Sequence, residues 1–66
     1  KAGSIEFNGG VIDCTIRNLS DTGAALEFAN AIGPPDSFWL TISGDHAPRH
    51  CRVAWRRDRR IGVAFD

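Results

Sequence analysis

The chain has 66 residues, and its eight basic side chains balance its eight acidic ones. A domain of this size buries only about 60% of the surface that its unfolded chain exposes, which argues against a two-lobed enzyme with a deep cleft. No apolar run approaches the roughly 18 residues of a membrane-spanning helix, and no signal peptide is visible, because the residues after Lys1 do not form the apolar segment of one. Because the sequence contains no methionine, we expect residues 1–66 to be a single domain from a longer protein.

Apolar and polar residues alternate in six short segments along the chain. This period of two is typical of half-buried strands, and no segment has the spacing of an amphipathic helix. In chain order, the residues expected to face inward are Ile5 and Phe7; Ile12, Cys14 and Ile16; Ala24, Leu26 and Phe28; Phe38, Leu40 and Ile42; Cys51, Val53 and Trp55; and Ile61, Val63 and Phe65.

Turn-forming residues separate the six segments, at residues 8–10, 18–23, 33–36, 43–48 and 57–59. Asparagine and glycine suit the tight turn of a hairpin, and the two prolines of residues 33–36 cannot lie inside a strand. Strands joined by short turns are most simply antiparallel, and six of them must close to cover their edges. The sequence therefore predicts an all-β fold, a small six-stranded antiparallel β-barrel.

The residues expected on the outer wall of this barrel are unusually small. Ala25, Ala54, Gly62 and Ala64 leave room for a flat group, either a ligand or a structural element from outside this chain. Trp39 is also expected to point outward, as a stacking platform or as the contact for such an element, and we favour the second.

Cysteines and catalytic motifs exclude several classes of function. Cys14 and Cys51 are too few for a disulfide scaffold or a zinc site, so we expect two reduced core thiols in a cytoplasmic protein without a metal. The sequence has no nucleophile elbow, no paired carboxylates in a defined setting and no phosphate-binding loop. We therefore predict that the chain is not an enzyme and needs no cofactor.

The charge is distributed unevenly. Residues 1–45 carry two basic and six acidic side chains, whereas residues 46–66 carry six arginines and two aspartates. Such an arginine cluster suits an anion, a nucleic acid or an acidic partner, or is simply a solvated hairpin tip. A nucleic acid is the less favoured ligand, because the net charge is zero and Trp55 is expected to point inward.

The turn at residues 18–23 has the pattern Asn-x-Ser-x-x-Gly, formed by Asn18, Ser20 and Gly23. The amide and the hydroxyl can hold the turn through bonds to the backbone, and Gly23 can take a left-handed conformation. The same two polar groups could instead point at a ligand.

Together with the sequences of residues 51–57 and 61–65, this turn resembles a PilZ domain over nearly the whole chain. PilZ domains are bacterial modules that bind the second messenger cyclic di-GMP, and the family motif Asp/Asn-x-Ser-x-x-Gly maps onto Asn18, Ser20 and Gly23. The resemblance implies a six-stranded barrel, in agreement with the strand count, and a regulatory module that passes the second-messenger level to a partner or fused domain.

A second family motif, Arg-x-x-x-Arg, lies ahead of the first strand in PilZ domains and is absent from these residues. Its arginines hold the phosphates and stack on the guanines. Arg56 and Arg60 have the same spacing, but they flank the last hairpin and are not its counterpart. Expected ligand-binding residues are Asn18, Ser20 and Gly23, with Arg17, Arg52 and Arg56 as lesser candidates. The alternative is a barrel that no longer binds nucleotide and acts as a protein-interaction module.

Overall fold

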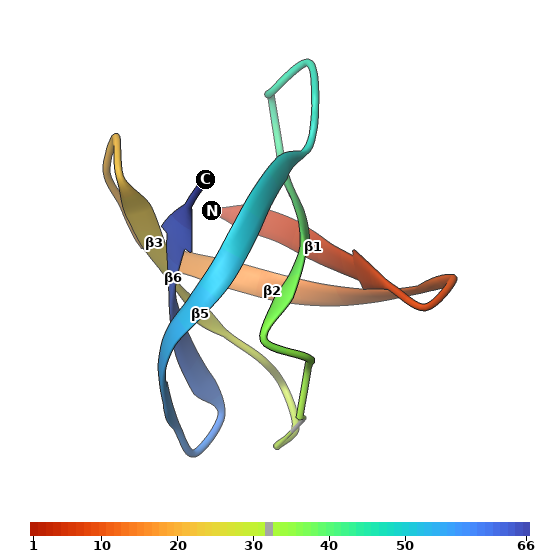
Figure 1. Cartoon of the computed structure of the whole chain (residues 1–66), viewed down its shortest axis with the longest axis vertical. Helices are drawn as coiled ribbons and strands as arrows, with labels where there is room; N and C mark the ends of the chain where they lie inside the picture. The colour runs from red at the N-terminus through yellow and green to blue at the C-terminus, as the bar shows by residue number, and fades with distance from the viewer. Residues whose placement is uncertain (32) are drawn as a thin grey trace.

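The computed structural model describes residues 1–31 and 33–66. Its elements are β1 (Ala2–Phe7), β2 (Gly10–Leu19), β3 (Gly23–Glu27), β4 (Ser37–Ile42), β5 (Arg49–Arg57) and β6 (Arg60–Phe65). Neighbouring strands are antiparallel, in the order β1-β2-β3-β6-β5-β4, and pairing of β1 with β4 closes the barrel (Figure 1). The predicted six-stranded antiparallel barrel is confirmed.

The described residues contain strands, turns and loops, and among them is no helix long and apolar enough to cross a membrane. Two tight hairpins lie where the turn residues predict them. Asn8 and Gly9 connect β1 to β2 with φ angles of 52° and 77°, and Asp58, with a φ of 54°, begins the connection from β5 to β6. Positive φ favours asparagine, aspartate and glycine, so these residues fix the register of both hairpins.

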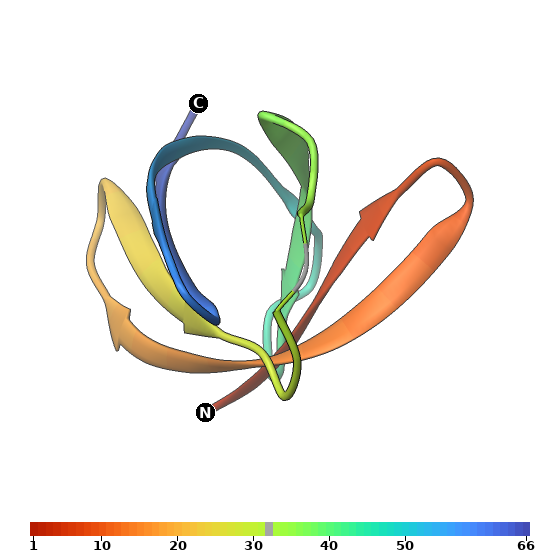
Figure 2. The ribbon, with the colours of Figure 1, turned by 90° about the horizontal axis from the view of Figure 1, so that it is seen from below.

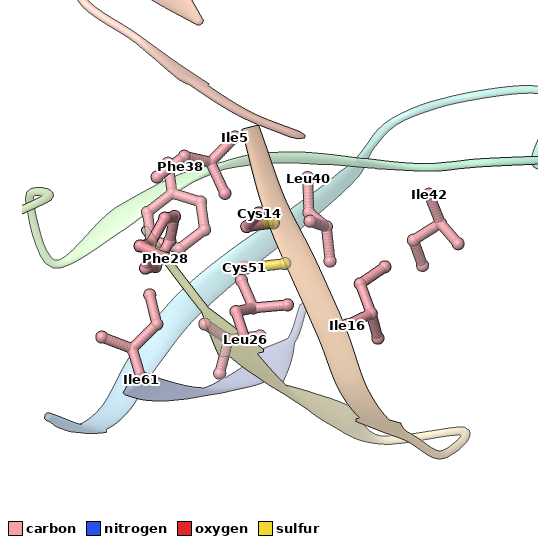
Figure 3. Packing of buried hydrophobic residues seen from close by; sticks show 11 residues of the cluster. Ile5, Cys14, Ile16, Leu26, Phe28, Phe38, Leu40, Ile42, Cys51 and Ile61 are labelled. Atoms are coloured by element: carbon pink, nitrogen blue, oxygen red, sulfur yellow. The ribbon is translucent and has the colours of Figure 1, made fainter. Parts of the chain in front are cut away.

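Among the described residues, eleven buried hydrophobic side chains form a core that fills the barrel, and Figure 3 shows how they gather from its walls. Leu26, Leu40 and Cys51 are completely buried. Each large apolar side chain so placed contributes about 1.5–3 kcal/mol through removal of apolar surface from water. Except for Trp55, every residue expected to face inward is in this core or packs against it.

The prediction for Trp55 is wrong, because a β-bulge interrupts β5. Val53 pairs with Val63 and Trp55 pairs with Gly62, which leaves Ala54 as the extra residue. A bulge reverses the alternation of the residues that follow it. Trp55 consequently lies on the outer wall with 47% of its surface exposed.

A second bulge interrupts β2, where Arg17 is the extra residue between Ile16 and Asn18. Beyond it the strand continues to Leu19, so the connection to β3 consists of residues 20–22. The turn is therefore shorter than the six residues that the sequence predicts, and Asn18 belongs to a strand.

Candidate functional site

Four strands contribute one residue each to a row across the outer wall. Asn18 on β2 pairs with Ala25 on β3, Ala25 pairs with Gly62 on β6, and Gly62 pairs with Trp55 on β5. The two bulges lie next to the two ends of this row and direct Asn18 and Trp55 outward. An amide and an indole therefore face the same surface across two residues with little or no side chain.

This row lies in a groove of about 260 Å³ that is also lined by Ser20, the first residue of the turn. Its lining includes all three residues of the Asn-x-Ser-x-x-Gly pattern, together with Ala54 and Trp55. The structure thus brings Asn18, Ser20 and Gly23 together with an aromatic side chain that the sequence pattern assigns to the core.

The hydroxyl of Ser20 holds the turn. Its Oγ donates to the carbonyl of Gly23 at 3.3 Å and accepts from the backbone N–H of Thr22 at 3.4 Å. The backbone N–H of Ser20 also donates to the Gly23 carbonyl, at 2.9 Å. These bonds are exposed, so a polar ligand can replace those of the side chain at little net cost in free energy.

Gly23 does not use the left-handed conformation that is open to glycine, since the positive-φ glycines of the described residues are Gly9 and Gly44. Gly23 is needed for a different reason. A Cβ atom there would lie 2.3 Å from the carbonyl oxygen of Val63. Only glycine lets the turn approach β6 this closely. This close approach forms the floor of the groove next to Ser20.

The indole of Trp55 lies against Gly62. A Cβ atom on residue 62 would be 2.0 Å from Nε1 and 2.3 Å from Cε2 of the ring. The small outer residues predict a flat group on this wall, and over Gly62 that group is the chain's own tryptophan. Period-two alternation could not identify Trp55 as exposed, but the glycine opposite it on the last hairpin is a sequence signal for it.

The three arginines proposed as lesser candidates do not line the groove. Arg17 is paired with Glu27 at 3.6 Å, and Arg52 donates to Asp66 at 2.9 Å. Arg56 donates to Asp36 at 3.1 Å. Beyond the bulge, Arg56 pairs with Ile61 of β6, so it does not continue the regular alternation of Arg52 along β5.

Trp39 and the two cysteines do not line this groove. Trp39 points outward, as predicted, and its ring meets that of His50 edge-on at 5.0 Å between centroids. Cys14 and Cys51 are free and buried, and burial raises the pKa of each thiol to about 11, so neither is a reactive nucleophile at neutral pH. In the described part of the chain, no three histidine, cysteine, aspartate or glutamate side chains gather as a metal site.

Comparison with known families agrees with this geometry. A family model described as the PilZ domain matches residues 2–66. Comparison with the curated proteins and with the solved structures gave no match. The matched region includes all six strands and the turn with the Asn-x-Ser-x-x-Gly pattern. The chain therefore belongs to the PilZ domain family.

Proposed function

We propose that this chain is a regulatory module that binds cyclic di-GMP in the groove between the turn at residues 20–22 and Trp55. PilZ domains form a family of cyclic di-GMP receptors and not a family of catalysts. The observation that carries the proposal is the shared groove of Asn18, Ser20 and Gly23 with an exposed indole. The ligand acts as a signal in this proposal, and no cofactor or reaction is required.

The chemistry of the groove suits a guanine base. A purine is planar and has hydrogen-bonding groups on its edges, and stacking of a base on an aromatic side chain contributes about 1–3 kcal/mol. Trp55 offers the stacking face, while Asn18 and Ser20 supply donors and acceptors for the edges of base and ribose. Ala25 and Ala54 keep the surface low, so a flat ring can approach the backbone.

The phosphates require cations that the groove itself does not supply. Arg17 adjoins Asn18, and its bond to Glu27 is a surface pair of the kind that contributes only about 0–1 kcal/mol, so it can exchange partners. The backbone N–H of Ile16 donates to the Lys1 carbonyl. Residues preceding Lys1 in a longer chain would thus enter beside Arg17, where an Arg-x-x-x-Arg segment could reach the ligand.

Regulation in this proposal depends on ordering such a segment. A nucleotide held between the barrel wall and an arginine-bearing arm would fix the arm, and that change would be passed to a fused domain or partner protein. Two free thiols in the core also suit the reducing cytoplasm in which we propose that the protein acts.

The test is an amide NMR titration of the chain with cyclic di-GMP. We expect shifts at Asn18, Ser20, Gly23 and the Trp55 indole. Trp55→Ala should weaken binding by about 5- to 150-fold, the equivalent of one lost stacking contact. Asn18→Ala and Ser20→Ala should also weaken it.

Two matched variants serve as controls. Trp39→Ala removes the other exposed tryptophan, and Arg60→Ala removes an arginine whose partner is Glu27. Both should leave the affinity nearly unchanged. Shifts at the arginines between Arg49 and Arg60, with none in the turn or at the Trp55 indole, would place the ligand elsewhere and contradict the proposed groove.

A further inference from the structure

Within residues 1–31 and 33–66, a stretch of β2 has a neighbouring strand on one side only. Residues Gly10 to Cys14 pair with β1, whereas pairing with β3 begins at Thr15, opposite Glu27. Beyond Glu27 the N–H of Phe28 donates to the carbonyl of Arg59 at 2.8 Å, so this backbone donor points to the β6 side and not to β2. Figure 2 shows the β1–β2 hairpin projecting from the barrel, with this edge of β2 along its outer border.

The hydrogen-bond pattern identifies which backbone groups are free on this edge. Gly10 pairs with Phe7 across a two-residue turn, so the N–H and C=O groups of even-numbered residues face β1. The bond from the N–H of Ile16 to the Lys1 carbonyl agrees with this assignment. Val11 and Asp13 therefore direct two donors and two acceptors away from the barrel, as the edge of an unfinished sheet does.

The side chains along the edge indicate what kind of segment fits. Val11 is 62% exposed, and no basic side chain among the described residues lies within ion-pair distance of Asp13. Asp13 and Phe28 line a groove of about 410 Å³ beside the edge, with Arg59 among its other lining residues. A second copy pairing antiparallel here would place Asp13 opposite a valine and leave the carboxylate without a cation.

From this edge we infer that the β1–β2 hairpin binds a partner's extended peptide segment, which adds a strand to β2 at Val11 and Asp13. The segment carries an apolar side chain beside Val11 and a basic one beside Asp13. Strand addition derives its affinity from backbone hydrogen bonds and its specificity from alternate side chains. This surface is separate from the nucleotide groove, and the inference does not depend on the proposed function.

The experiment uses a short capped peptide of alternating valine and lysine as the probe, followed by NMR and amide hydrogen exchange. We expect the amides of Val11 and Asp13 to shift and to exchange more slowly. Asp13→Lys should weaken binding about fivefold or more, because it replaces a cross-strand attraction with a repulsion. Val11→Pro should abolish binding, since it removes one free donor at a position where the N–H faces solvent.

The controls separate strand addition from simple charge attraction. Glu6→Lys makes the same charge change on the same hairpin, but on a strand that is paired on both sides, and should leave affinity within about twofold. A peptide with the same side chains and N-methylated backbone should not bind. Equal binding of that peptide, equal loss in Glu6→Lys, or stronger binding of a valine–glutamate peptide would overturn the inference. Concentration-dependent protection of Val11 and Asp13 without peptide would instead identify a second copy as the occupant and also overturn it.

Discussion

At position 62 the lack of a side chain determines where a tryptophan lies. Trp55 is held against the backbone of Gly62, and any larger residue would occupy the space of its indole nitrogen. The ring is half-exposed. Removing it should therefore cost less than the about 3–5 kcal/mol typical of a tryptophan buried in a core.

We predict that Gly62→Ala destabilises the barrel by about 1–3 kcal/mol, because the new methyl group displaces the indole. In a Trp55→Ala background the same substitution should be nearly neutral, so the two positions should show strong coupling. Urea unfolding of the four members of this cycle, with circular dichroism as the signal, measures the coupling. Additive effects would mean that the indole does not lie on Gly62.

The two buried thiols should make the stability of the barrel depend on pH. Burial, and to a smaller extent the charge of Asp13, raises the pKa of Cys14 from 9.0 to about 11, and burial acts in the same way on Cys51. The folded protein then favours the protonated thiols more than the unfolded chain does. Their stabilising effect is complete below pH 9 and is lost as the pH rises from 9 to 11.

Unfolding in urea at about pH 8 and about pH 10.5 should show a fall in the free energy of unfolding of about 1–3 kcal/mol per thiol. Cys14→Ala and Cys51→Ala should each reduce this dependence. A thiol reagent should react with two cysteines in the unfolded chain and with neither in the folded chain. Rapid reaction of the native protein would contradict the burial of these groups.

At the scale of elements, the sequence predicts the strands better than it predicts the irregularities within them. Alternation and turn residues identify all six strands, since burial of one face imposes period two wherever pairing is regular. The bulges at Arg17 and Ala54 lie where β2 pairs with β3 and where β5 pairs with β6, and alternation along β2 or β5 alone does not reveal them. The error for Trp55 follows directly from this.

The candidate site was predictable to the extent that its residues lie close together in the sequence, around one turn. Asn18, Ser20 and Gly23 are close in sequence, so a pattern of three letters groups them. Trp55 comes from a distant strand and reaches the same groove only because of the bulge. The reason for Gly23 also required tertiary structure, because its constraint is the carbonyl of Val63 and not its own backbone angles.

The end of β6 is fastened to β5 through Asp66. The carboxylate accepts from His50 Nδ1 and from Arg52 Nε. The backbone N–H of Asp66 donates to the His50 carbonyl at 3.1 Å. The hydrogen bond from His50, more than the charge of Arg52, lowers the pKa of this carboxyl below 3.8, against a smaller opposing effect of burial. The resulting stabilisation is present above pH 3.8 and is lost as the pH falls through the folded-state pKa.

We predict that His50→Ala raises the pKa of Asp66 towards its ordinary value, and that Arg52→Gln raises it less. A carbon-detected NMR titration of the Asp66 carboxyl in the three proteins provides the measurement. Glu6→Gln, which changes an exposed acid on another part of the wall, should not move it. An unchanged Asp66 pKa in His50→Ala would show that the histidine does not hold this carboxylate.

At the scale of the whole molecule, the barrel is closed, and the two binding surfaces that we propose lie on its outside. Pairing of β1 with β4 removes most of the sheet edges, so large rearrangements within the wall are not expected. In the proposed function, the part that responds to the nucleotide is therefore a segment added to the wall. The groove supplies base recognition, and phosphate recognition depends on cations brought to it.

Phosphate recognition by an arginine-bearing arm should determine how tightly the nucleotide binds. Each charge-assisted hydrogen bond to a phosphate contributes about 1.5–3 kcal/mol. An arm with two arginines that make several such bonds should therefore raise affinity by roughly two to four powers of ten. We predict that residues 1–66 bind cyclic di-GMP weakly, and that a longer chain with an Arg-x-x-x-Arg segment ahead of Lys1 binds it tightly. Calorimetric titration of both chains, with the arm arginines changed to alanine as the control, makes the comparison.

Tight binding by residues 1–66 alone would direct attention to the arginines between Arg49 and Arg60. If the longer chain carried both arginines and still failed to bind, the barrel would instead be a protein-interaction module.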